Sequence, residues 1–335
     1  MKISVVIPTH NRSDALAKTL ANLAKQKFAE NWEVIVINNG STDDTDDVVL
    51  RQSFPVKLRL LHEAKLGVAA ARNAGAEAAG GEYLSFLDND ILVEPDYLDR
   101  QYTALRANPG CWAMGQVINL PEQERTPFGQ YRKSLYGFIP PGSDIQEASW
   151  MTGQVVSLPK ADFVQLGGFD ENFGGASVED FDLAIRAWEL GIKILFFPSI
   201  VAVHNDWAGF SIRDYCRRQR LYSQQEPLFW LKYGEKHPRL NLVRENLPPF
   251  LKHDSSLLLL RKQMKRFLAT GLAQKVLFDL CDLLEQFQLP TPILWRIYRV
   301  VLSTSIYVGF QEGLAAYSMD DIASRFEPLI SNKHH

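Results

Sequence analysis

Short apolar runs alternate with amphipathic stretches over about the first 110 residues. Leu16, Leu20 and Leu23 recur at helical spacing, and the alanine-rich stretch Gly67–Gly75 suits a helix that packs closely on a sheet. The apolar runs have the length of buried strands and lie at Lys2–Ile7, Glu33–Asn38, Lys57–His62 and Glu82–Leu87. Strands that alternate with helices are typical of a parallel sheet, so we predict a Rossmann-like half domain here.

The pattern changes after about residue 110. The predicted elements are two strands at Trp112–Ile118 and Ser149–Leu158 around a Pro/Gly-rich loop at Pro121–Gly142, then a helix at Val178–Leu190 and two short strands at Ile194–Phe197 and Ile200–His204. A loop of that length inside a domain is more often functional than idle. Residues 111–210 are therefore expected to complete one α/β domain.

Beyond residue 210 the chain is predicted to be helical to its end, with breaks at Pro248-Pro249 and around Pro290. The longest apolar stretch, Ile293–Phe310, contains Arg296 and Arg299, which makes a membrane span costly. We expect this stretch to pack as a helix against the first domain, with a role at the membrane surface as the alternative.

Composition and charge narrow the class of protein only slightly. The 335 residues are 46% hydrophobic and 22% charged, as in globular proteins with a substantial core. The 36 Lys/Arg and 39 Asp/Glu give a net charge of −3, so nothing global indicates nucleic acid as a partner. The segment from Arg213 to Arg266, however, contains thirteen basic and five acidic residues. This local positive charge fits an anionic or lipid-diphosphate-linked acceptor, or an anionic membrane.

Cysteine usage and the first residues indicate the compartment. Cys111, Cys216 and Cys281 lack a C-x-x-C spacing, which favours a reducing environment. Met1–Pro8 has neither the apolar length nor the cleavage site of a secretory leader, so we interpret it as a strand. A cytoplasmic protein is expected, with peripheral contact at the inner face of the membrane as an open alternative. The oligomeric state is left open.

Two carboxylates follow the predicted strand that ends at Leu87. Asp88 and Asp90 would lie at the carboxyl end of a parallel strand, where open α/β sheets bind ligands. Their hard oxygen ligands suit Mg²⁺ or Mn²⁺. Taken alone, the D-x-D pattern is weak and favours a solvated turn, because such short acidic turns arise by chance in many chains.

Three further stretches fall in an order and spacing that resembles glycosyltransferase family 2. They are Val5–Arg12, Ile37–Asp43, and Gly67–Gly75 followed by Gly81–Asp90. The resemblance covers about residues 1–205. It implies a GT-A fold, an α/β architecture with a Rossmann-like, mostly parallel sheet and flanking helices. The catalytic domain would be residues 1–210, with a nucleotide-binding half at about 1–110 and an acceptor half at about 111–210, and residues 211–335 would form a helical extension.

The resemblance also implies an activity and its partners. Members are inverting, metal-dependent enzymes that move a sugar from a nucleoside diphosphate to an acceptor hydroxyl. Here the donor would be UDP-, dTDP- or GDP-linked, and the acceptor a saccharide or a lipid-linked molecule in cell-surface polysaccharide or glycoconjugate synthesis. Mn²⁺ or Mg²⁺ would be the cofactor.

Site residues are carried over position by position from the same resemblance. Asp180 is the expected catalytic base and Glu179 its neighbour in the acidic pair. Asp88, Asp90 and His204 are the expected metal ligands. The expected nucleotide-sugar contacts are Pro8, Thr9, Asn11, Arg12, Asn39, Arg72, Asn73, Asp88, Asn89 and Gly153. Many members have an aspartate where Asn39 stands, and because an amide both donates and accepts, the identity of the base stays open.

Structural roles compete with these assignments. Asn39-Gly40 is an ordinary turn sequence, Arg72 would serve as a solvated helix residue, and a histidine after an apolar strand, such as His204, is usually structural. Glu179 and Asp180 would be favoured at a helix N-terminus by the dipole alone.

Three other functions compete with a glycosyltransferase. A nucleotidyltransferase is disfavoured because no Gly-rich, basic phosphate loop follows the first strand. A binding scaffold without catalysis is disfavoured by the presence of Asp88, Asp90, Asp180 and His204. A dinucleotide dehydrogenase is excluded because G-x-G-x-x-G is absent after the first strand.

Overall fold

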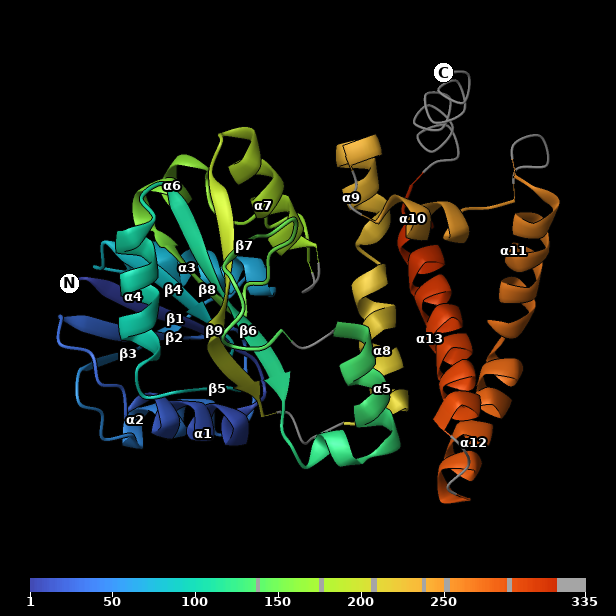
Figure 1. Ribbon diagram of the computed structural model, residues 1–335, viewed down its shortest axis with the longest axis horizontal. Helices are drawn as coiled ribbons and strands as arrows, with labels where there is room; N and C mark the ends of the chain where they lie inside the picture. Colours follow the sequence, from blue (N-terminus) through green and yellow to red (C-terminus); the bar gives the residue numbers. More distant parts are fainter. Residues whose placement is uncertain are drawn as a thin grey trace. The chain divides into compact units, whose positions relative to one another are not determined.

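The computed structural model describes residues 1–136, 139–174, 178–205, 210–236, 239–249, 254–287 and 291–317. The chain divides into two compact units, Met1–Ala208 and Gly209–His335. The described part of the first unit is a sheet with helices on its faces, and that of the second consists of helices (Figure 1). The prediction of an α/β domain followed by a helical region is thus confirmed for the described residues, while the expected break at Pro290 and residues 318–335 lie outside them.

The N-terminal half of the first unit is a parallel sheet in the order β3-β2-β1-β4. Its strands are β1 (Ile3–Thr9), β2 (Trp32–Asn38), β3 (Lys57–His62) and β4 (Tyr83–Leu87), and its helices are α1 (Ser13–Leu23), α2 (Thr45–Arg51) and α3 (Val68–Ala78). The four predicted strands are therefore confirmed. All residues of β1 and β2 are buried, which explains their nearly continuous apolar sequences.

The sheet continues beyond β4 with mixed pairing, and it has nine strands within the described residues. Strand β8 (Val155–Pro159) runs antiparallel to both β4 and β6 (Cys111–Asn119), and β9 (Lys193–His204) runs parallel to β6. The remaining elements of this unit are β5 (Ile91–Val93), α4 (Tyr97–Ala107), a 3₁₀ turn (Gln123–Arg125), α5 (Pro127–Tyr136), β7 (Gln146–Glu147), α6 (Lys160–Gln165) and α7 (Glu179–Glu189).

Three local predictions were wrong. The two short strands expected between Ile194 and His204 are one strand, β9, because β6 pairs with both segments across a register shift at Gly115. The expected loop contains helix α5, whose apolar positions Phe128 and Tyr131 span too few turns to give a clear period. The strand expected from Ser149 begins only at Val155.

Helix α3 packs unusually closely on the sheet, and this packing prepares the site. A Cβ atom on Gly75 would lie 2.5 Å from Val6 and 2.6 Å from Ile37, so only glycine permits this distance between helix and strands. Arg72 lies one turn earlier on the same helix and is buried. The small residues of α3 therefore bring a guanidinium group beneath the carboxyl ends of the strands.

The second unit is built around a long helix, α13 (Thr291–Leu314). Ideal Cβ atoms on Gly309 and Gly313 would lie 1.9 Å and 2.0 Å from the carbonyl oxygens of Arg220 and Gln224, so α13 and α8 pack backbone to backbone. The other helices are α8 (Ile212–Ser223), α9 (Glu226–Tyr233), a 3₁₀ turn (Gly234–Lys236), α10 (Leu240–Asn246), α11 (Ser256–Leu268) and α12 (Gly271–Gln286). Among the described residues, no helix is long and apolar enough to cross a membrane.

Candidate active site

One buried arginine joins three carboxylates from two different parts of the first unit. Arg72 Nη2 donates to Asp88 Oδ1 at 2.9 Å, and Arg72 Nη1 donates to Glu179 Oε1 and Asp180 Oδ1, both at 3.0 Å. The Arg72 side chain is 3% exposed and that of Glu179 1%. The guanidinium therefore links the end of β4 to the N-terminal turn of α7.

Burial and charge act in opposite directions on these groups. Burial lowers the pKa of Arg72, but the charges of Asp180, Asp88 and Glu179 outweigh burial, so its pKa lies above the usual value. Burial raises the pKa of Asp180, while the charge of Arg72 and the Gly153 N–H act to lower it, and the net pKa is raised. Asp180 is therefore a stronger base than an aspartate in water, as a group that accepts a proton requires.

Gly153 completes the cage around this cluster. Its N–H donates to Asp180 Oδ2 at 2.8 Å. A Cβ atom on Gly153 would lie 2.5 Å from the Cζ and Nη1 atoms of Arg72. The missing side chain thus makes room for the guanidinium of Arg72, a steric reason that the sequence did not reveal.

The turn between β4 and β5 holds the remaining carboxylate, Asp90. The central residue of the turn, Asn89, donates from Nδ2 to Thr9 Oγ1 at 2.7 Å, which anchors the turn to the end of β1. Asp90 Oδ2 lies 3.6 Å from His204 Nε2 and 3.3 Å from Arg12 Nη2. The structure therefore brings Asp90 and His204 together, while Asp88 pairs with Arg72.

Whether a metal ion fits this site depends on the chemistry of Asp90 and His204. Within the described residues, no group of three or more His, Cys, Asp or Glu side chains is arranged to hold a metal ion. Asp90 and His204 nevertheless offer one carboxylate oxygen and one imidazole nitrogen at the carboxyl end of the sheet. This pair fits Mn²⁺ better than Mg²⁺, because Mg²⁺ prefers oxygen ligands.

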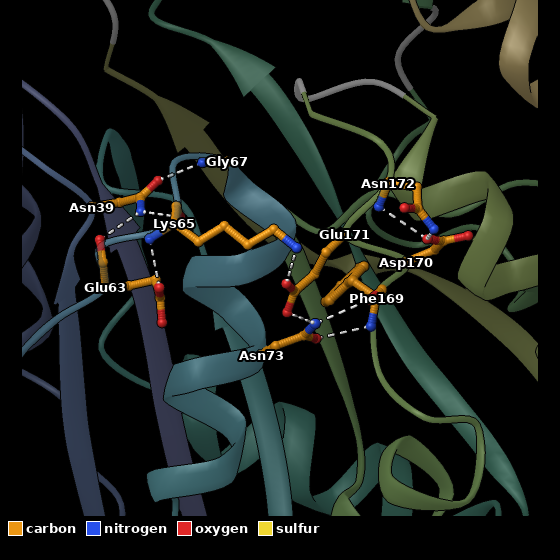
Figure 2. A network of polar contacts seen from close by, with 9 residues as sticks. All are labelled: Asn39, Glu63, Lys65, Gly67, Asn73, Phe169, Asp170, Glu171 and Asn172. Carbon is orange, nitrogen blue, oxygen red and sulfur yellow. Dashed lines mark hydrogen bonds and ion pairs between the residues drawn. The ribbon is translucent and has the colours of Figure 1, made fainter.

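The side chain of Asn39, which follows β2, forms its hydrogen bonds with the loop before α3 (Figure 2). Its Nδ2 donates to the carbonyl oxygens of Glu63 and Lys65 at 3.0 and 2.8 Å, and its Oδ1 accepts the Gly67 N–H at 2.8 Å. Both donors of the side-chain amide are thereby used. An aspartate could accept from Gly67 but could not donate to either carbonyl, so the amide fits this loop better.

Asn73, one position after Arg72, binds a different loop (Figure 2). Its Nδ2 donates to the Phe169 carbonyl oxygen and to Glu171 Oε1, both at 2.9 Å, and its Oδ1 accepts the Phe169 N–H. Lys65 Nζ lies 2.7 Å from Glu171 Oε2. An ion pair therefore links the loop held by Asn39 to the loop held by Asn73.

The end of β1 and the residues that follow it contact the turn after β2. Thr9 and Pro8 are buried, and the Thr9 carbonyl accepts the Asn39 N–H at 2.9 Å. Asn11 has a positive φ of 50° and accepts the Thr42 N–H at 2.7 Å, which holds the β1 and β2 turns together. Arg12 is partly exposed, and its guanidinium points toward Asp90.

Most of the expected site residues thus gather at one edge of the sheet, but in two groups. Arg72, Asp88, Glu179, Asp180 and Gly153 form one group, and Arg12, Asp90 and His204 form the other. Lys65 and Glu171 were not anticipated. Their pairing spans 106 positions, so no local pattern could have indicated it.

Residues 83–319 match Glycosyl transferase family group 2, and residues 4–150 match Glycosyl transferase family 2. The first of these matches covers well over half of the chain. The chain belongs to glycosyltransferase family 2. The resemblance inferred from the sequence motifs is therefore confirmed.

Individual relatives of this family 2 chain match it over shorter stretches. Over 110 residues it is 43% identical to validoxylamine A glucosyltransferase of Streptomyces hygroscopicus subsp. jinggangensis (strain 5008), a match to 32% of this chain and 26% of that protein. Over 124 residues it is 30% identical to glycosyltransferase GlyA of Streptococcus pneumoniae serotype 4, a match to 37% of this chain and 18% of that protein. The matches thus span about a quarter or less of these relatives.

A solved structure resembles almost the whole chain. It is mannosyltransferase PcManGT from Pyrobaculum calidifontis in complex with GDP-Man and Mn²⁺, with a TM-score of 0.60 and 18% sequence identity over 93% of this chain and 88% of that one. At this identity the likeness concerns the fold alone. The expected GT-A architecture of the family 2 chain is confirmed.

Proposed function

We propose that the protein is an inverting, divalent-metal-dependent glycosyltransferase that moves a sugar from a nucleoside diphosphate to an acceptor hydroxyl. The observation that carries this proposal is the buried cluster in which Arg72 holds Asp88, Glu179 and Asp180 together. Membership of the family agrees with it. Burial raises the pKa of Asp180 within this cluster, which supports its assignment as a proton acceptor.

In this proposal Asp180 is the general base. In an inverting transfer the acceptor hydroxyl attacks the anomeric carbon opposite the leaving diphosphate and must lose its proton as it does so. Asp180 uses one oxygen for Arg72 and the other for the Gly153 N–H, and each carboxylate oxygen keeps a second lone pair for that proton. Glu179, almost fully buried on Arg72, orients the guanidinium and touches no substrate.

The donor would lie across the ends of β1 and β2. Pro8, Thr9 and Asn11 would shape the surface under the base, and Asn39 would hold the loop that flanks it. Asn73 would fix the loop on the acceptor side, and Asn89 would anchor the D-x-D turn. Asp88, whose Oδ1 is taken by Arg72, would offer its second oxygen to the ribose or to the metal.

Asp90 and His204 would hold Mn²⁺ or Mg²⁺. The bound cation would neutralise charge on the diphosphate as it leaves. Arg12, with its guanidinium 3.3 Å from Asp90, would turn toward the same phosphates. The donors open to this site are UDP-, dTDP- and GDP-linked sugars. The acceptor would be a saccharide or a lipid-linked molecule of cell-surface glycoconjugate synthesis.

Asp180→Asn tests the central assignment. The variant keeps the shape of the side chain but cannot accept a proton, so turnover should fall by about 10²- to 10⁴-fold while the donor dissociation constant moves little. After screening of nucleotide sugars with and without Mn²⁺, release of nucleoside diphosphate gives the turnover and calorimetry gives the affinity.

Glu179→Gln is the matched control in this test. It should lower turnover less than Asp180→Asn, because Glu179 acts only through Arg72. Near-normal turnover of Asp180→Asn would contradict the assignment of Asp180 as the base and would indicate that it only stabilises the N-terminus of α7. A larger loss with Glu179→Gln would reverse the roles within the acidic pair.

A further inference from the structure

Helix α11, labelled in Figure 1, exposes an apolar stripe. Its members are Leu257, Leu260, Met264 and Phe267, which are between 54% and 70% exposed. Their spacings of three, four and three residues place them on one side of the helix. Large apolar side chains scattered singly need no explanation, but four aligned on one helix indicate a surface that is normally covered.

The opposite side of α11 provides its attachment to the rest of the unit. Lys262 is 3% exposed, and its Nζ donates to the Pro248 carbonyl oxygen at 3.1 Å and to Asp254 Oδ2 at 2.8 Å. At 3.6 residues per turn, the stripe lies about 140–160° around the helix axis from Lys262. The stripe therefore takes no part in the internal packing that Lys262 marks.

The charges of α11 indicate what covers the stripe. Arg261, Lys262, Lys265 and Arg266 are its charged residues, and it has no Asp or Glu. Arg261 is exposed beside the stripe, with its Nη1 3.9 Å from Glu245 Oε1, whereas Arg266 lies only about 40° around the helix axis from Lys262 and faces away from the stripe. If a second copy covered the stripe through a twofold axis, it would bring these like charges together. An anionic lipid surface would match both the charges and the apolar side chains.

We propose that α11 binds an anionic lipid bilayer, with its apolar stripe entering the boundary between head groups and acyl chains and Arg261 contacting lipid phosphates. An amphipathic helix with Lys/Arg on its polar side and Leu and Phe on the other lies in a membrane interface in this way. The apolar exposure continues into α12 at Leu272 and Val276, with Lys275 between them. Binding here does not depend on the glycosyltransferase activity.

Sedimentation with vesicles of phosphatidylcholine alone, or with about a third phosphatidylserine, tests this proposal on the full chain. The wild type should bind the anionic vesicles more tightly. Each basic residue near an anionic leaflet strengthens binding about fivefold, so Arg261→Gln should weaken it about fivefold. Binding should also weaken between 0.1 M and 1 M salt, because the screening length falls from about 10 to about 3 Å.

A second variant tests the apolar stripe. Leu260→Gln, Met264→Gln and Phe267→Gln together should weaken binding to anionic vesicles on the order of 100-fold, because each removes a large apolar side chain from the interface. Leu50→Gln with Arg51→Gln is the matched control, since both residues are exposed on α2 of the first unit. It should change binding by less than about twofold.

Three results would overturn the proposal. They are no binding of the wild type to anionic vesicles, equal binding to neutral and anionic vesicles, and an apolar-stripe variant that binds vesicles normally but loses an oligomeric state of the wild type. The last result would assign the stripe to a second copy of the chain. Donor hydrolysis without vesicles should be unchanged in every variant, so failure of the proposed function would be detected separately.

Discussion

Replacement of Arg72 by methionine is the most demanding test of the buried cluster. The variant keeps much of the side-chain volume but removes the cation from three carboxylates that lie 2.9–3.0 Å from it. Leaving buried charge without its partner costs about 3–5 kcal/mol. We expect the free energy of unfolding at pH 7 to fall by about that amount, the upper end being favoured because the Arg72 side chain is only 3% exposed.

The loss of stability caused by Arg72→Met should increase as the pH rises. In wild type the charge of Arg72 acts to lower the pKa of Asp180, so its removal raises that pKa further above the value in the unfolded chain. A carboxyl group whose pKa is raised by folding loses stability as the pH rises from its unfolded pKa, about 3.9 for Asp, through its folded pKa. The deficit of Arg72→Met should therefore be small near pH 4.5 and full at pH 7.

Urea-induced unfolding at pH 4.5, 5.5 and 7, followed by tryptophan fluorescence, measures this dependence. Arg51→Met is the control, because Arg51 is 79% exposed and should contribute less than about 0.5 kcal/mol at any pH. A loss below about 1 kcal/mol at pH 7, or a loss equal at all three values, would refute the argument that Arg72 compensates buried negative charge.

Three further substitutions test other parts of the site. Gly153→Ala should lower turnover at least about tenfold in the nucleotide-release assay, because its Cβ would lie 2.5 Å from the Arg72 guanidinium, whereas Gly142→Ala, with open space around it, should not. Asn39→Asp should destabilise the loop before α3 by about 1–3 kcal/mol, because a carboxylate cannot donate to the two carbonyl oxygens. Unfolding measurements and hydrogen exchange of the loop would detect this loss. Unchanged stability together with tighter binding of uridine nucleotides would instead indicate that residue 39 contacts the nucleotide base. Asp90→Ala should abolish Mn²⁺-dependent donor binding in calorimetry without loss of folding. An unchanged affinity for the donor in the presence of Mn²⁺ would show that Asp90 is not a metal ligand.

Local pattern determined the first half of the fold. Strands β1, β2 and β4 are short apolar runs that are almost entirely buried, β3 is partly exposed, and the alternation of these strands with helices has few topological solutions, so they were predictable. The motifs around Asp88 and Asp180 were predictable in the same sense, because each follows a strand or opens a helix. Their order along the chain was enough to identify the family, which the comparisons confirm.

Only the tertiary structure determined which of these residues meet. Arg72 contacts Glu179 and Asp180, which lie 107 and 108 positions later in the sequence. The periodicity of hydrophobic residues cannot predict a contact between positions so far apart. The contact depends on the close approach of α3 to the sheet at Gly75 and on the space left by Gly153. Hydrophobic periodicity is a property of a few neighbouring residues, whereas the position of a buried charge is decided by every element that packs around it.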